Sequence, residues 1–557
     1  MNMLKVKIKR NLTEEILSVD KETLCIDLLK QYENDSEVPI VLVKINGVLK
    51  ELSTPILEDC TLELLDITDK AGMMCYIRSL QFVLIKAVNE VFPRSKLTIE
   101  HSLSKGLFGE IEKKPPLVID DVYDIKNKMD EIIQADLPIV RKKLLRKDAI
   151  ELFKAKGMED KVSLLSTVNQ EKVTIYSLGG TYDYFYGPMV YSTGQLKYYD
   201  LISYDPGFIL RYPTSEAPTQ IPRFVSHKKL AKIFNEAENW GNILNVTHVG
   251  ALNEKIQEGD GEIVTLIRVA EALHEKKIAH IADEINKDRS IKLITIAGPS
   301  SSGKTTFCKR LDIQLRVNGL IPIPISLDDY FVNRDETPLD EFGELDFECI
   351  NAFDLQLFNE HLLLLMDGKE VELPSFNFKT GRREWNGNKV KLPKDGVIII
   401  EGIHGLNNML TEAIDDENKF KIYISPLTEI NIDYHNRIST TDVRMIRRIV
   451  RDHLSRGYDV EYTLKMWPSI KRGEDKYIYP FQEEADIMFN TALIYELAVL
   501  KKYAIEELKK VKPDNPVYNE AVRLLEFLQM FKDIDKDSVP SNSLIREFIG
   551  GSCFYQY

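Results

Sequence analysis

At 557 residues the chain is too long for one hydrophobic core, and about three or four domains are expected. Its 44% apolar and 29% charged residues are typical of a globular protein. The net charge of −14 argues against a general nucleic-acid or membrane-surface role, which favours a basic balance, although a local basic face is compatible with it. The six cysteines include no C-x-x-C pair, and no apolar run approaches the roughly 20 residues that span a bilayer. We therefore expect a cytoplasmic protein with reduced thiols and no membrane contact.

Residues 1–70 are predicted to form a small module of strands with one helix. Polar and apolar residues alternate with period two from Leu4 to Lys9, and Asn46-Gly47 is a strong turn signal between two further strands. The expected elements are strands at 4–9, 14–19, 38–45, 48–52 and 61–67 and a helix at 23–32. This order, with its "INGVLKEL" hairpin, resembles the TGS domain, a β-grasp module of threonyl-tRNA synthetases and some GTPases, and it implies that fold here.

Residues 71–220 extend that resemblance. An amphipathic helix opens at Cys75 and ends near Phe92, and residues 185–210 are rich in aromatic and β-branched side chains. The layout is similar to the α+β editing domain of threonyl-tRNA synthetases, which hydrolyses mischarged tRNA with an H-x-x-x-H pair and a C-x-G-P-H segment. The positions that match these motif residues are Arg78, Phe82, Phe185 and Met189, and none is a general base or a good metal ligand. We therefore expect the fold without the editing activity, and the resemblance implies an RNA or tRNA contact through these N-terminal domains.

Residues 221–290 are predicted to be a helical connector, because apolar side chains recur at i, i+3 and i+4 between Ile263 and Ile285. From residue 291 to residue 492 strands alternate with helices or loops, which is the pattern of a parallel, doubly wound sheet with ligands at the carboxyl ends of its strands. The expected strands are 291–297, 323–327, 396–400, 419–425 and 486–490. Residues 493–557 are predicted to be a helical segment, and packing on the core or a homo-oligomer contact would explain its amphipathic pattern. The expected fold class is α/β multidomain.

A phosphate-binding loop is predicted directly after the first of these strands. The sequence reads G-x-x-x-x-G-K-T and runs into a helical pattern at 307–317, which is the order that a P-loop requires. Two glycines let backbone N–H groups turn inward as an anion nest at a helix N-terminus. Lys304 then reaches the β- and γ-phosphates, and the Thr305 hydroxyl binds Mg²⁺. The predicted nucleotide-binding residues are Gly298, Pro299, Ser300, Ser301, Ser302, Gly303, Lys304, Thr305 and Thr306.

Two acids follow apolar strands at the same predicted edge of the sheet. Asp328 lies where a kinase needs a carboxylate to orient an acceptor hydroxyl and take its proton. It could instead cap a turn, and the adjacent Asp329 competes for the role. Glu401 follows three isoleucines, at the position where P-loop enzymes hold the metal or its water, and capping a helix is its alternative.

Arginines recur at helical spacing at Arg444, Arg447 (or Arg448) and Arg451, so they share one helix face. A solvated basic face is one interpretation of such a run. In an acidic protein with a phosphate loop, the pattern favours a lid that closes over the nucleotide and neutralises the transferring phosphoryl group.

Six blocks between residues 290 and 492 occur in a characteristic order, namely "GPSSSGKTT", "SLDDYF", "DFE…AFD", "LPSFNF", "IIIEGIHGLN" and "DVRMIRRIVRD". In order and approximate spacing they resemble the uridine kinase and phosphoribulokinase family. The resemblance implies that Lys304 and Thr305 bind ATP and Mg²⁺, that Asp328 is catalytic base and metal ligand, and that Glu401 completes the metal shell. It also implies that Asp346 holds ribose hydroxyls, that Phe376 and Phe378 bracket the base, and that Arg444, Arg447 and Arg451 are lid and substrate arginines. The order of domains is similar to that of bacterial uridine or nucleoside kinases with TGS and editing-like domains.

The sequence therefore predicts an ATP- and Mg²⁺-dependent kinase that acts on the 5′-hydroxyl of a nucleoside. Gly381 lies where uridine kinases place a base-reading His, and Met466 lies near where a Gln contacts the pyrimidine, so the identity of the base stays open. Two alternatives also stay open. One is a related kinase for a non-nucleoside alcohol such as a sugar phosphate, and the other is a regulatory protein that grips tRNA and uses ATP as a switch.

Overall fold

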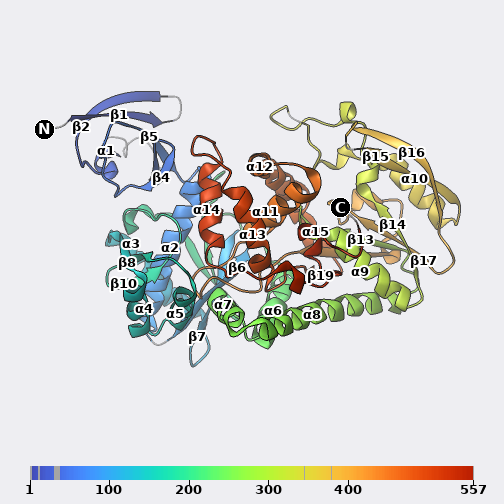
Figure 1. The fold of residues 1–557 in the computed structure, drawn as a ribbon, viewed down its shortest axis with the longest axis horizontal. Coiled ribbons are helices and arrows are strands. Elements are labelled where there is room, and N and C mark those ends of the chain that lie inside the picture. The colour runs from blue at the N-terminus through green and yellow to red at the C-terminus, as the bar shows by residue number, and fades with distance from the viewer. Residues whose placement is uncertain are drawn as a thin grey trace.

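The structure is a computed structural model of the sequence, and it describes residues 3–10, 13–29, 38–93, 95–343, 345–377 and 379–555. Within these residues the strands form five sheets. Figure 1 shows three small sheets of the N-terminal half at one end of the molecule and the sheet with the P-loop toward the other end. Helices from the connector and from the C-terminal segment fill the space between the two ends.

The first sheet has the strand order β2-β1-β5-β3-β4, with β1 and β5 parallel and the other pairs antiparallel. Its elements are β1 (Met3–Arg10), β2 (Thr13–Asp20), α1 (Cys25–Leu29), β3 (Ile40–Ile45), β4 (Val48–Glu51) and β5 (Cys60–Asp66). The strands lie within a few residues of the predicted ranges. The Asn46-Gly47 turn joins β3 to β4 with a positive φ at both residues, which is why that dipeptide gives a strong hairpin signal.

Two more sheets, with the orders β10-β9-β8 and β11-β12-β7-β6, surround the buried helix α2. The elements are α2 (Lys70–Val91), β6 (Lys96–Leu103), β7 (Gly106–Glu112), α3 (Ile119–Gln134), β8 (Ile139–Leu145), α4 (Arg146–Ala155), α5 (Glu159–Thr167), β9 (Lys172–Leu178), β10 (Thr181–Tyr184), β11 (Asp200–Tyr204) and β12 (Gly207–Arg211). By length and composition α2 could cross a membrane, which corrects the expectation that no apolar run reaches that length. However, 78% of its apolar window is buried inside the structure, as in a core helix.

Three helices form the connector, and the longest, α8, packs along α9 of the next domain (Figure 1). The helices are α6 (Lys228–Ile243), α7 (Val249–Glu258) and α8 (Asp260–Lys287). In α8 the buried side chains follow the predicted helical spacing and include Ile263, Ile267, Ile278, Ile281 and Ile285. The helix packs against the parallel-sheet domain through α9.

The fourth sheet is parallel throughout, with the strand order β14-β17-β13-β18-β19. Its strands are β13 (Leu293–Ala297), β14 (Ile321–Ser326), β17 (Gly396–Glu401), β18 (Lys419–Ser425) and β19 (Ile487–Asn490), close to the predicted ranges. The helices around it are α9 (Lys304–Val317), α10 (Leu355–Met366), α11 (Thr440–Arg451) and α12 (Val460–Tyr477). The two central strands, β13 and β17, consist almost entirely of buried residues, as expected for a parallel sheet covered on both faces.

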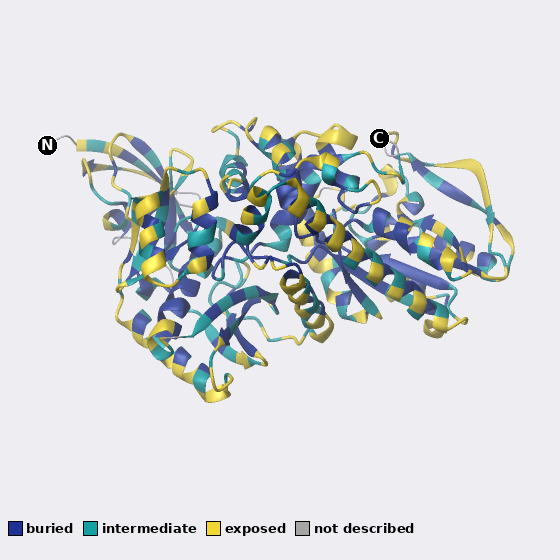
Figure 2. Ribbon diagram, turned by 60° about the horizontal axis from the view of Figure 1, so that its bottom comes forward, coloured by how far each residue is buried: buried dark blue, intermediate teal, exposed yellow. Residues whose placement is uncertain are grey.

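An antiparallel hairpin of β15 (Glu370–Asn377) and β16 (Arg382–Lys391) projects from this domain. Figure 2 shows the hairpin at one end of the molecule with much of its surface exposed, whereas the parallel strands are buried. The C-terminal helices α13 (Glu496–Leu508) and α14 (Tyr518–Leu528) and the short α15 (Arg546–Ile549) pack into the largest hydrophobic core. Core packing therefore explains the amphipathic pattern of the C-terminal segment.

Candidate active site

The predicted phosphate loop runs from the end of β13 to the start of α9. Gly303 and Ser301 both have a positive φ, of +86° and +60°, so the loop takes the left-handed backbone turns that let N–H groups converge. A Cβ on Gly298 would clash with the carbonyl oxygen of Ile424 on β18. Both glycines of the motif are thus required by the local geometry.

The polar groups of the loop fit a polyphosphate ligand. Lys304 Nζ arches back to the carbonyl oxygens of Gly298 and Pro299, at 2.9 and 3.2 Å. Among the described residues no partner meets the buried hydroxyls of Ser301 and Ser302, which therefore offer donors inside the loop. Burial lowers the pKa of Lys304, while the charges of Glu401 and Asp328 act against that shift.

The side chains predicted to hold a metal, those of Thr305, Glu401 and Asp328, lie near Lys304. Thr305 Oγ1 donates to Glu401 Oε1 at 3.0 Å, and Glu401 stands at the end of β17. Burial raises the pKa of Glu401 to about 7. The positive charge of Lys304 opposes this rise, and the negative charge of Asp328 adds to it. The described residues hold no cluster of three or more His, Cys, Asp or Glu side chains that could bind a metal alone. One hydroxyl and two carboxyl groups suit Mg²⁺, which keeps water and phosphate oxygens as its other ligands.

Asp328 and Asp329 follow β14 in a short 3₁₀ turn, and the structure separates their roles. Asp329 accepts the N–H of Phe376 at 3.1 Å and so ties the base of the β15–β16 hairpin to the turn. Asp328 keeps a solvent-exposed side chain although protein atoms crowd around it. This partial desolvation raises the pKa of Asp328, and Lys304, Arg456 and Arg451 lower it in opposition. Of the two aspartates, Asp328 is therefore the one on which the charges of Lys304, Arg451 and Arg456 act.

Arg444 and Arg447 of α11 reach the backbone of the phosphate loop, and both are already paired with carboxylates. Arg444 binds Glu474 through two hydrogen bonds, of which the Nη2–Oε2 bond is 2.6 Å long, and Glu474 also accepts the N–H of Ser300 at 3.0 Å. Arg447 binds Glu496 and donates to the Thr491 carbonyl oxygen at 2.8 Å. Both guanidinium groups are buried and brace the loop. Their role at the transferring phosphoryl group stays a prediction, and it requires these pairs to open.

Two further arginines reach the site: Arg448, which the sequence offered as an alternative to Arg447, and Arg456, which sequence reasoning missed. Arg448 Nη1 donates to Ser300 Oγ at 2.7 Å, and its Nε donates to Asp452 at 3.1 Å. Arg456 contributes to the field at Asp328 together with the predicted Arg451. Burial and the charge of Arg456 lower the pKa of Arg451 to about 10, and its Nε lacks a partner among the described residues. The continuous helical pattern of the "RMIRRIVRDHLSR" run was the available signal for both.

The residues predicted to bind the acceptor are Asp346, Phe376 and Phe378. Phe376 packs against Phe331 with ring centroids 5.5 Å apart, and Phe378 lies outside the described residues. Asp346 accepts from Tyr477 Oη at 3.1 Å and from the N–H of Glu348 at 3.1 Å, so its carboxylate is engaged in a turn. Gly381 closes the hairpin turn with φ +68°, and the side chain of Arg334 lies over it, where a Cβ would be 2.8 Å from Nε.

Glu348 is a carboxyl group that sequence reasoning missed, although the "DFE" block contains it. Burial and Glu474 raise the pKa of Glu348 to about 7, while Arg448 and Lys304 lower it and Asp328 raises it further. These partners place Glu348 in the field of the phosphate loop and of Asp328. A Cβ on Gly473 of α12 would lie 2.5 Å from Glu348 Cβ, so this glycine makes room for the side chain.

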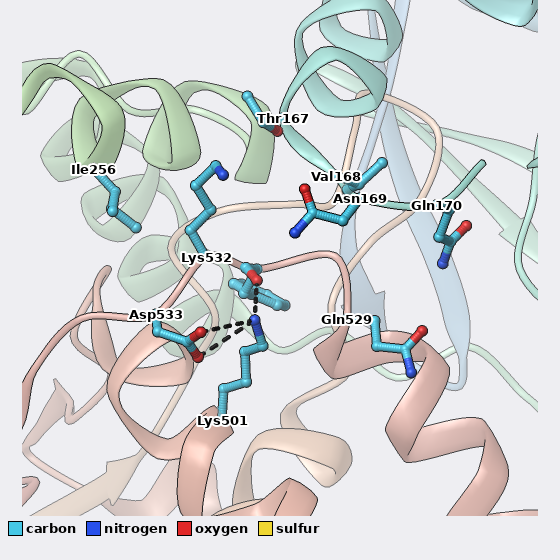
Figure 3. Close-up of a pocket in the computed structure, with 10 residues that line it drawn as sticks. Thr167, Val168, Asn169, Gln170, Ile256, Lys501, Gln529, Lys532 and Asp533 are labelled. Atoms are coloured by element: carbon cyan, nitrogen blue, oxygen red, sulfur yellow. Dashed lines mark hydrogen bonds and ion pairs between the residues drawn. The ribbon is translucent and has the colours of Figure 1, made fainter.

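One surface hollow lies apart from this site. It has a volume of about 430 Å³ and lies between the turn after α5, the end of α7 and the loop after α14 (Figure 3). Lys501 reaches into it and pairs with Asp533, and it donates to the Phe531 carbonyl oxygen at 2.6 Å. None of the residues predicted for nucleotide, metal or acceptor binding lines it.

Comparisons with known proteins assign the two halves of the chain to different relatives. In its N-terminal region the chain is 32% identical over 161 residues to the threonine–tRNA ligase of Symbiobacterium thermophilum and 34% identical over 161 residues to that of Desulforamulus reducens. Each match covers 29% of this chain and 25% of the ligase, so the chain spans about a quarter of the length of these relatives. Arg78, Phe82, Phe185 and Met189 all belong to this half: Arg78 and Phe82 are residues of α2, and Phe185 packs against Phe82.

Solved structures and a family model match the other half. A "possible uridine kinase" of Bacillus stearothermophilus is 22% identical, with 36% of this chain and 89% of that chain covered and a TM-score of 0.22. D-glycerate 3-kinase of Cryptococcus neoformans is 15% identical, with 49% and 87% covered and a TM-score of 0.22. The model of the phosphoribulokinase / uridine kinase family matches residues 293–496. The matched residues contain the parallel sheet with its P-loop, Asp328, Glu401 and the arginine helix, and they form a domain of the phosphoribulokinase / uridine kinase family.

Proposed function

We propose that residues 291–492 transfer the γ-phosphoryl group of ATP to the 5′-hydroxyl of a nucleoside, with Mg²⁺. The observation that carries the proposal is the convergence of three groups at one edge of the parallel sheet. Lys304 stands at the start of α9, the Thr305–Glu401 pair joins that helix to β17, and Asp328 follows β14 within the field of Lys304. Phosphoryl transfer needs little covalent work from a protein, so the positions and charges of such groups supply most of the catalysis.

Each side chain has one task in this proposal. Lys304 exchanges its loop carbonyl partners for phosphate oxygens, and the inward N–H groups of the loop bind the same oxygens. Thr305, Glu401 and Asp328 would hold Mg²⁺, which when bound neutralises charge on the β- and γ-phosphates. Asp328 accepts a hydrogen bond from the acceptor hydroxyl and takes its proton. Its raised pKa brings it closer to the pH at which it must accept and release that proton.

The acceptor is proposed to lie between Asp328 and the β15–β16 hairpin. Phe376 and Phe331 supply an aromatic wall, and Asp329 fixes that wall through the Phe376 N–H. Glu348 and Asp346 are the nearest carboxyl groups for ribose hydroxyls. The charges of Lys304 and Asp328 act on the pKa of Glu348, which indicates that its carboxyl group lies near them. This favours Glu348 over Asp346, whose carboxylate already accepts two hydrogen bonds.

A nucleoside screen tests the proposal. ADP release would be followed by a coupled assay with ATP, Mg²⁺ and a panel of nucleosides, sugar phosphates and glycerate, and the product would be identified by mass spectrometry. Phosphorylation of a nucleoside at the 5′-position supports the proposal, and turnover confined to a sugar phosphate or glycerate contradicts the nucleoside part of it. The Lys304→Ala variant should lose ADP release with every acceptor.

A non-nucleoside acceptor is the second candidate, and the hairpin favours it. Gly381 holds the tight hairpin turn under Arg334, so an arginine side chain covers the position at which uridine kinases carry a base-reading His. A guanidinium group suits a phosphate or carboxylate on the acceptor better than an uncharged base. The acceptor panel separates the two, because Arg334→Ala should raise KM for an anionic alcohol and leave KM for a nucleoside nearly unchanged.

The division of the chain remains part of the proposal. We propose a TGS-like domain at 1–70, an editing-like domain at 71–220, a connector at 221–290 and a C-terminal helical segment at 493–557. The separate sheets and the similarity to threonine–tRNA ligases support this division. An RNA contact through the N-terminal half is the corresponding proposal for its partner, and tRNA binding that weakens steeply with salt would support it.

A further inference from the structure

A segment from the far end of the chain lies directly on the phosphate loop. Glu547 of α15 accepts hydrogen bonds from Thr306 through one carboxylate oxygen, at 2.9 Å from the hydroxyl and at 3.3 Å from the backbone nitrogen. Tyr555 Oη bonds to the same Thr306 hydroxyl. Leu544 packs against Gly303, where a Cβ would be 2.8 Å from its Cδ2. In Figure 1, α15 lies between α11 and β13.

This segment is held firmly by contacts of its own. Leu544, Ile545, Phe548 and Ile549 are buried in the largest hydrophobic core. The guanidinium group of Arg447 stacks over the Phe548 ring at 5.1 Å, so an arginine that braces the loop also holds α15. Arg546 donates to the carbonyl oxygens of Lys536, Val539, Pro540 and Gly550. In this structure the packing of its own segment therefore positions the Glu547 carboxylate at Thr306.

Glu547 takes donors that a bound polyphosphate needs. Thr306 is the third residue of α9, and its N–H is one of the first N–H groups of the helix, which have no partner within the helix. In a P-loop those groups bind phosphate oxygens, and the helix N-terminus favours a single anion there. The charge of Glu547 is also felt at Lys304 and Glu401, so it lies inside the electrostatic field of the phosphate site. A carboxylate and a phosphate cannot use the same N–H and hydroxyl group at once.

We propose that the 540–555 segment is an internal competitor of the nucleotide, in which the Glu547 carboxylate stands in for a phosphate group and must withdraw from Thr306 before ATP can bind. This inference rests on the proposed nucleotide site and concerns its regulation. The apparent affinity for ATP is then the intrinsic affinity reduced by the fraction of molecules in which the segment has withdrawn. Any contact that draws α15 away from α11 would raise that fraction and activate the domain.

Binding of Mg²⁺ and a non-hydrolysable ATP analogue, measured by calorimetry on the full chain, tests the proposal. Glu547→Gln keeps the shape of the side chain and removes its charge, and it is expected to tighten binding by about tenfold. Tyr555→Phe removes one hydroxyl without changing any charge, and it is expected to tighten binding by a smaller factor. Asp537→Asn is the matched control, because it removes one negative charge from an exposed side chain of the same part of the chain.

Hydrogen exchange of the wild-type chain provides the second measurement. Saturation with the analogue should speed amide exchange at residues 544–549 while it protects residues 298–306. Unchanged protection of 544–549 at saturation, or equal or weaker binding by both Glu547→Gln and Tyr555→Phe, overturns the competitor. If wild type and Glu547→Gln both fail to bind the analogue and match Lys304→Ala, the nucleotide site itself is wrong and the competitor falls with it. Binding by wild type that the two variants leave unchanged overturns the competitor alone.

Discussion

Lys161 Nζ on α5 lies 2.9 Å from Asp433 Oδ1, and both side chains are fully buried. Asp183 contacts the same ammonium at 3.1 Å and also binds His435 at 2.6 Å. Lys161 and Asp183 belong to the N-terminal half, whereas Asp433 and His435 belong to the kinase domain. Burial opposes the charge of Lys161, yet the carboxylates raise its pKa overall, so it stays protonated. The two halves of the chain therefore meet in a buried ionic cluster.

Removal of the central cation of this cluster should destabilise the protein strongly. Lys161→Ala leaves buried carboxylates without their counter-charge, and the expected loss in the free energy of unfolding is about 3–5 kcal/mol. Urea titration followed by tryptophan fluorescence would measure it as a lower midpoint. The matched control is Lys143→Ala, an exposed lysine on β8, for which a change within about 0.5 kcal/mol is expected. Equal midpoints for the two variants would show that the cluster contributes nothing to the joint between the halves.

The two adjacent aspartates after β14 should give different kinetic phenotypes. Asp328→Asn removes the group that accepts the proton, so kcat is expected to fall by at least about 100-fold while the Kd for ATP stays nearly constant. Asp329→Asn weakens the hydrogen bond to the Phe376 N–H, so it should raise KM for the acceptor and change kcat much less. Steady-state kinetics with the best acceptor of the panel, together with ATP calorimetry, measures both. Near-normal turnover by Asp328→Asn removes that residue from the role of base.

Much of this site was predictable because its signals are local. The P-loop is one continuous run, and Asp328 and Glu401 each follow an apolar strand whose end fixes the place of the next residue. The arginine spacing of α11 indicated a shared face, and Arg444 and Arg447 both reach the loop. In each case neighbours in the sequence determine the position of the side chain, so a pattern of a few residues is sufficient.

The features that the sequence did not reveal depend on distant residues. Strand β16 is almost wholly exposed, so it lacks the alternation of buried and exposed side chains that marks a strand. The partner of Arg444 is Glu474 on another helix, and the partner of Thr306 is Glu547, beyond the whole domain. Lys161 and Asp433 come from different domains. Long-range pairs of this kind leave no periodic trace, and only the folded chain brings them together.

Thr305 and Glu401 should act as one unit toward the metal. Thr305→Ala removes the donor of a 3.0 Å hydrogen bond and Glu401→Ala removes its acceptor, and each removes one oxygen ligand, so each is expected to raise the Mg²⁺ concentration for half-maximal activity by about tenfold. The double variant should show less than the product of the two effects, because contacting residues that share one ligand are coupled. A Mg²⁺ titration of activity at saturating ATP measures this for the wild type, the two single variants and the double variant. Independent, multiplicative effects would contradict a shared metal site.

The pH dependence of stability should carry the signature of Glu100, a partly buried carboxyl group on β6. Burial, with the charges of Glu238 on α6 and of Glu110 on β7, raises the pKa of Glu100 from 4.5 to about 8. The folded chain therefore holds a proton that the unfolded chain releases above pH 4.5, so this stabilisation is fully present below pH 4.5 and is lost as the pH rises through about 8.

Glu100→Gln keeps the uncharged form at every pH, so its melting temperature should match that of the wild type near pH 4.5 and exceed it above pH 8. Thermal unfolding across that range measures the difference. Glu151→Gln, on an exposed face of α4, controls for the loss of one negative charge and should follow the wild-type curve. A Glu100→Gln curve that runs parallel to the wild type at all pH values would show that Glu100 is charged in the folded chain, and that the packing of α6 against β6 and β7 does not depend on its proton.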